Sequence, residues 1–162
     1  MTSKGFPRGF PHSGQTGRCT SIELIQLFVR DSDESELKEA IESVRNVDIA
    51  RIFVDALLER NQEIAVLLLK RVITDIGKEE IKRYTERLEG RYALYICHFW
   101  VSEFINRSHV YYDGAVDVLR VMRGIADERE WKRYITTLME QNAGKKKLLE
   151  KIRKTLLIQE NQ

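Results

Sequence analysis

The chain has 162 residues, of which 43% are hydrophobic and 32% charged, and its formal net charge is +2. A chain of this length can bury a core without a metal or disulfides, and two cysteines are too few for a disulfide framework. No apolar run approaches the roughly 20 residues that cross a bilayer, and no apolar stretch at the N-terminus resembles a secretory signal. We therefore expect a soluble intracellular protein.

Residues 1–20 differ in composition from everything that follows. They hold both prolines and four of the nine glycines, with Lys4, Arg8 and Arg18 and no acidic residue. Such a segment buries too little apolar surface to offset the entropy lost on ordering it. We predict a disordered basic tail over residues 1–20 and a single helical domain over residues 21–160.

After Pro11 no proline interrupts the chain, and apolar residues recur at helical spacing, as in Leu37, Ala40, Ile41 and Val44. Side chains that cap helices precede several of these stripes: Thr20 with Glu23, Asp33 with Glu36, Asn46, and Asn61. We predict helices over residues 21–30, 33–44, 47–60, 62–76, 78–89, 91–107, 113–124, 126–141 and 145–158.

The arrangement of these helices follows from their apolar faces and short connections. The segment 64–76 is apolar on nearly all sides, as expected of a helix at the centre of a bundle or solenoid. Connections of about two to five residues make neighbouring helices antiparallel, and no fixed period repeats along the chain. The predicted fold is all-α, an irregular α-solenoid-like stack of antiparallel helices, about eight or nine in number.

No histidine, cysteine or serine has the sequence spacing of a metal site or of a catalytic nucleophile. The histidines His12, His98 and His109 belong to no C-x-x-C or H-x-x-x-H pattern, so we expect no metal. No serine lies in a glycine elbow. Residues 9–16 have the glycine spacing of a phosphate loop, but Gln15 replaces its lysine. We expect neither an enzyme nor a cofactor-binding protein, and no small-molecule substrate.

One segment near the end of the sequence is strongly basic. Residues 145–154 read KKKLLEKIRK, with six basic residues and one acidic residue. On a helix the lysines would form one face and Leu149, Ile152 and Leu156 another, so that one face docks on the protein and the other on phosphate. The alternative is an ordinary solvated C-terminal helix. The candidates for RNA contact are Lys145, Lys146, Lys147, Lys151 and Lys154.

Three features occur in the order found in one family. Leu37-Lys-Glu-Ala40-Ile41 is followed by Arg45-Asn-Val-Asp-Ile49 and then by the leucine-rich segment 64–76. Further along come Trp100, His109 and a tyrosine at 111 or 112, and then a Gly-Lys joint in "AGKKKLLEKI". This order resembles the C-terminal helical domain of WD-repeat subunits of the small-subunit processome, the U three protein family of ribosome-assembly factors. The resemblance covers residues 24–158. The sequence departs from the family's pattern in three ways: it contains no WD-repeat propeller, it lacks the family's Leu-Pro pair, and it has an extra predicted helix over residues 77–90.

The resemblance implies an architectural function. A member of this family would act as a ribosome-biogenesis scaffold in the nucleolus, contacting other helical-domain processome subunits and the pre-ribosomal RNA complex, and would support processing of the small-subunit rRNA. Because aromatic residues anchor interfaces, the candidates for partner contact are Trp100, Phe104, Tyr111 and Tyr112. Two alternatives stay open: a general α-helical adaptor, and a helical RNA-binding protein that uses its basic termini.

Overall fold

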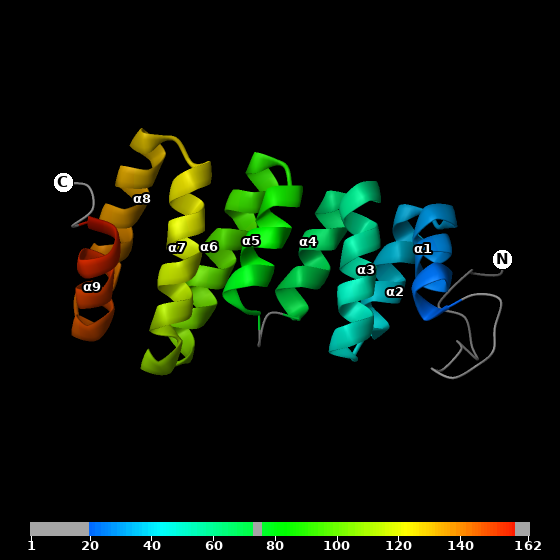
Figure 1. Cartoon of the computed structure of the whole chain (residues 1–162), viewed down its shortest axis with the longest axis horizontal. Helices are drawn as coiled ribbons and strands as arrows, with labels where there is room; N and C mark the ends of the chain where they lie inside the picture. The colour runs from blue at the N-terminus through cyan, green and yellow to red at the C-terminus, as the bar shows by residue number, and fades with distance from the viewer. Residues whose placement is uncertain (1–19, 73–75, 158–162) are drawn as a thin grey trace. The chain divides into compact units, whose positions relative to one another are not determined.

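The computed structural model describes residues 20–72 and 76–157 (Figure 1). In this part of the chain all regular structure is helical, so the prediction of an all-α fold with eight or nine helices is confirmed. The nine α-helices are α1 (Ser21–Asp31), α2 (Glu34–Ser43), α3 (Val47–Arg60), α4 (Gln62–Arg71), α5 (Lys78–Arg87), α6 (Gly90–Arg107), α7 (Tyr112–Ile125), α8 (Glu128–Gln141) and α9 (Lys146–Ile152).

Two short turns of other helical types complete these elements. A 3₁₀ turn, η2 (His109–Tyr111), joins α6 to α7, and a π-helical turn, η3 (Arg153–Leu157), continues α9. The predicted helix over 62–76 ends earlier, at Arg71. The predicted tail over residues 1–20 lies outside the described residues, except for Thr20. None of the helices in the described ranges is both long and apolar enough to traverse a bilayer.

The predicted start signals cap four helices. The side-chain oxygens of Thr20, Asp33, Asn46 and Asn61 accept hydrogen bonds from the backbone N–H three residues later, at 3.1, 2.8, 3.0 and 3.2 Å. Asp33 and Glu36 form a complete capping box, because the Glu36 carboxylate accepts from the Asp33 N–H at 3.0 Å. Each such cap stabilises a helix by about 1 kcal/mol.

The chain divides into two compact units, residues 1–74 and 75–162, and the division falls between α4 and α5. The sequence predicts one domain over residues 21–160, and no change of composition between α4 and α5 marks this division. Each unit has its own buried apolar core, so each is described by itself.

In the first unit, α3 packs against both α1 and α4, and α2 packs against α4. Phe53 of α3 is fully buried and meets Phe28 of α1 edge-on, with ring centroids 6.2 Å apart. Ile64, Leu68 and Leu69 of the leucine-rich segment are also fully buried. This segment is therefore a central part of the core, as its lack of a polar face indicates.

Two arginines close the ends of helices in this unit, and we call them the arginine clasps. Arg60, at the end of α3, donates from Nε to the Val29 carbonyl (3.1 Å) and from Nη2 to the Ser32 carbonyl (3.2 Å), at the end of α1. Arg71, at the end of α4, donates to the carbonyls of Ile41 and Val44, at the end of α2. Because the ends meet in this way, α1 runs parallel to α3 and α2 runs parallel to α4.

In the second unit, α6 and α7 form the main helical hairpin. The two helices approach closely at Gly114, where an added Cβ would lie 3.3 Å from Cδ2 of Phe104. Helices α5, α8 and α9 each pack against α7. The core of this unit includes the fully buried side chains of Tyr84, Trp100 and Leu119.

Candidate interaction surfaces

Side chains with reactive groups meet where α6 contacts α8. The Cys97 thiol is fully buried, and burial raises its pKa to about 12, so it stays protonated and is a poor nucleophile at neutral pH. The ring of His98 meets that of Tyr134 edge-on at 4.4 Å between centroids. Burial lowers the pKa of His98 and raises that of Tyr134 to about 12. Both rings are therefore neutral at pH 7, and their contact is one of packing.

Over residues 20–72 and 76–157, no cluster of three or more His, Cys, Asp or Glu side chains is placed to hold a metal ion.

The structure places three of the four predicted interface aromatics in the core of the second unit. Trp100, Phe104 and Tyr112 are 0, 3 and 7% exposed, whereas Tyr111 is 38% exposed. The three buried rings pack within the unit and cannot anchor a partner while it is folded. The sequence pattern misplaced them because α6 is apolar on several sides, so the spacing alone does not tell which side is covered.

Tyr111 belongs to a cluster at the connection between α6 and α7. Its ring lies parallel to that of Phe104, with centroids 6.2 Å apart, and the Arg107 guanidinium carbon lies 5.2 Å from the Tyr111 centroid. Beside it, Val110 is 71% exposed, the most exposed large apolar residue of those described. We call Val110 and Tyr111 the α6–α7 tip. The sequence does not reveal Val110 as exposed, because a single valine in a turn between two helices carries no periodic signal.

The basic C-terminal helix has the two faces that the sequence predicts. Leu149, Ile152 and Leu156 are buried, and the neighbouring Leu148 is buried with them. Opposite this apolar face, four basic side chains are exposed to solvent, and we call them the α9 basic face: Lys146, Lys147, Arg153 and Lys154. The apolar contacts hold the helix on the protein while these side chains extend into solvent.

Two of the five predicted RNA contacts, Lys145 and Lys151, do not belong to the α9 basic face. Lys145 occupies the N-cap position of α9 and is half-buried. Lys151 is half-buried, and its Nζ lies 2.8 Å from Oδ1 of Asp113 at the start of α7. Lys151 therefore joins α9 to α7. This partner lies 38 residues earlier in the chain, so no local pattern reveals it.

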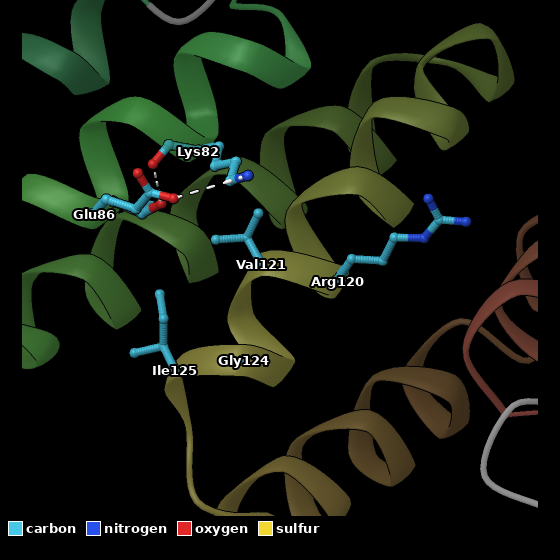
Figure 2. A pocket seen from close by; sticks show the side chains of 7 residues that line it. Lys82, Glu86, Arg120, Val121, Gly124 and Ile125 are labelled. Carbon is cyan, nitrogen blue, oxygen red and sulfur yellow. Dashed lines mark hydrogen bonds and ion pairs between the residues drawn. The ribbon is translucent and has the colours of Figure 1, made fainter.

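A groove of about 340 Å³ lies between α5 and α7, with Val121 and Ile125 of α7 among its lining residues (Figure 2). Lys82 and Glu86 on its rim face each other, with Nζ and Oε1 4.0 Å apart, while Arg120 points away from them (Figure 2). The Thr85 hydroxyl donates to the Ile81 carbonyl of its own helix at 2.8 Å. A site for a specific small ligand requires polar groups that converge on one point, and the polar groups of this groove do not.

Comparisons with protein-family models, with curated proteins and with solved structures give no match for this chain. The resemblance to processome subunits therefore stays a prediction from the sequence.

Proposed function

We propose that the protein is a non-catalytic helical scaffold that associates with helical-domain subunits of the small-subunit processome in the nucleolus and supports processing of the small-subunit rRNA. The observation that carries this proposal is the place of the family-like motifs in the fold. Leu37, Ala40, Ile41 and Trp100 are all at most 4% exposed. These apolar motif residues therefore belong to the helical core, whereas residues 45–48 of the second motif and His109 are exposed. A shared core pattern favours a shared helical architecture.

The α6–α7 tip is the surface that we assign to a protein partner. Exposed apolar residues that occur singly are normal on a protein surface, but Val110 and Tyr111 are adjacent in the chain, and the Arg107 guanidinium lies over the Tyr111 ring. Tyrosine and arginine are the residue types most enriched where binding energy concentrates in interfaces. A helical partner that covers the tip would remove the exposed Val110 side chain from water.

Affinity purification tests the proposal. A tagged copy expressed in cells should co-purify with processome subunits and pre-rRNA, localise to the nucleolus, and be needed for small-subunit rRNA maturation. Treating the extract with ribonuclease before capture shows which subunits are held by protein contacts. A diffuse cytoplasmic signal, with capture of helical proteins from other complexes, would contradict the proposal and favour a general adaptor.

A matched pair of variants tests the tip. Val110→Glu places a charge at the tip, and Val47→Glu makes the same change at a valine that is 37% exposed in the first turn of α3. Both are tolerated by the fold, because Val110 is exposed and an acidic residue is favourable in the first turn of a helix. We expect Val110→Glu alone to reduce capture of the partner subunits. Equal capture by both variants would exclude the tip as the contact.

A further inference from the structure

The four cations of the α9 basic face have no acidic partner among the described residues. Several lysines of other helices do have one, as Lys38 pairs with Glu34 at 3.0 Å and Lys132 with Glu128 at 3.2 Å. No ion pair joins a cation of the α9 basic face to another described residue. Glu150 is the one acidic residue of α9, and it is exposed between them. The four cations are therefore available to a partner.

The start of α9 also departs from the electrostatic preference of a helix. Helices favour acidic residues in their first turn, and seven of the nine described α-helices have one there. Helix α9 instead begins with Lys146 and Lys147. Exposed cations at this end of a helix are unfavourable, because they repel the positive end of the helix dipole. Departures from local preference that nothing in the fold compensates are expected at functional sites.

Charge is also distributed unevenly between the two units. Residues 20–72 hold 7 basic and 11 acidic residues, a net charge of −4, whereas residues 76–157 hold 17 basic and 12 acidic residues, a net charge of +5. The small charge of the whole chain thus hides a basic second unit, to which α9 belongs. A surface of one sign attracts a polyanion and raises its rate of association.

We infer that the α9 basic face binds the phosphodiester backbone of a nucleic acid without reading its sequence. Lysine is a flexible point charge that suits phosphate, and phosphate contacts position a protein without specifying bases. Lys146 and Lys154 are eight residues apart, about 12 Å along a helix, which matches the span of several phosphates of one strand. This inference goes beyond the proposed function, since direct contact with nucleic acid needs no partner subunit.

An acidic protein also has the charge to be attracted to this face, but the structure favours nucleic acid. The exposed residues of α9 are all charged, and its apolar residues Leu148, Leu149 and Ile152 are buried. Protein interfaces of good affinity need apolar or aromatic anchors at their centre. A backbone of phosphates needs none, because release of its counterions provides the free energy of binding.

The test uses the purified full-length protein and a fluorescein-labelled oligouridine RNA of about 20 nucleotides, with binding followed by anisotropy. Four contacts to a single strand give a slope of about −2.8 for the logarithm of affinity against that of salt concentration. Affinity should therefore fall about 50-fold between about 50 and 200 mM salt. A slope near zero for the wild-type protein, or no binding at the lower salt concentration, would overturn the inference.

Two protein variants, each with four cations replaced by glutamate and therefore with the same net charge, locate the contact. One reverses the α9 basic face: K146E, K147E, R153E and K154E. The control reverses four exposed cations that pair within their own segments: K38E, K82E, R91E and K132E. We expect the first variant to lose the salt-dependent binding and the control to keep most of it. Equal losses in the two variants would show that only net charge matters, and would overturn the assignment to α9.

A gain of binding provides a test that unfolding cannot imitate. Glu150→Lys adds a fifth cation to the face and should steepen the salt slope by about 0.7. A DNA strand of equal length should bind with similar affinity, because lysines do not sense the 2′-hydroxyl that distinguishes RNA. An unchanged slope in the Glu150→Lys protein, or binding of polyglutamate in place of RNA, would contradict the inference.

Discussion

The arginine clasp at Arg71 allows a quantitative test of how the first unit is held together. The last carbonyls of a helix lack the full set of acceptor partners that the helix interior provides. The Arg71 guanidinium donates from another helix to the carbonyls of Ile41 and Val44, and the Ile41 carbonyl also accepts from the Val44 N–H at 3.3 Å. A hydrogen bond to a charged group contributes about 1.5–3 kcal/mol when buried. The Arg71 side chain is exposed, so water replaces part of each bond once it is removed. We expect Arg71→Ala to lower the free energy of unfolding by about 1–2 kcal/mol.

Thermal unfolding followed by circular dichroism measures this change. For a chain of this size the loss corresponds to a fall in Tm of about 2–8 °C. Arg71→Lys keeps the charge but presents one donor centre in place of a planar fork, so it should recover about half of the loss. A lysine variant as stable as the wild type would show that charge alone, acting on the helix end, accounts for the clasp.

Arg45 provides the control for this experiment. It lies at the same end of α2 and also donates to carbonyls, but only to those of Glu42 and its neighbour Val44. It joins no second helix, so Arg45→Ala should cost less than about 0.5 kcal/mol. Equal costs for Arg45→Ala and Arg71→Ala would refute the view that the clasp stabilises by linking α2 to α4.

Four further predictions concern the second unit. Gly124→Ala should stabilise the protein to urea by about 0.5–1 kcal/mol, because the added methyl group meets open space. Gly114→Ala should be less stable than Gly124→Ala by about 1–2 kcal/mol, because its methyl group would press on a ring of α6. Burial lowers the pKa of His98 in the folded protein, so the unfolded state takes up a proton at this residue at a higher pH than the folded state does. The free energy of unfolding, measured with urea, should therefore decrease as the pH is lowered past about 6.5. Replacing His98 by Asn should remove this decrease. In native protein Cys97 should resist thiol reagents at pH 8, and mass spectrometry of the labelled peptides would detect any reaction.

The parts of this fold that the sequence predicts correctly depend on neighbouring residues. The caps at Thr20, Asp33, Asn46 and Asn61 each involve a residue and the backbone three positions later. The buried face of α9 follows in the same way from the spacing of its leucines and isoleucine. In both cases the residues that determine the structure lie within one or two turns of helix.

The parts that it does not predict depend on residues far apart. The Arg60 clasp spans 28 and 31 residues, and the pair of Lys151 with Asp113 spans 38. The aromatic residues of α6 are a related case: Trp100 and Phe104 have the composition of an interface anchor and are core residues. Exposure depends on which helices cover α6, and that is a property of the tertiary structure.

The α9 helix shows how these two kinds of information combine. Its apolar face alone would make it an ordinary terminal helix that completes a core. Its first turn, however, would be more stable with acidic residues, and reversal of Lys146 and Lys147 should therefore raise the stability of the helix while weakening its attraction to phosphate. Folding and nucleic-acid binding make opposite demands on these two positions. The lysines present there are the residues that binding favours, and a raised Tm with lost RNA binding in Lys146→Glu/Lys147→Glu protein would demonstrate that opposition directly.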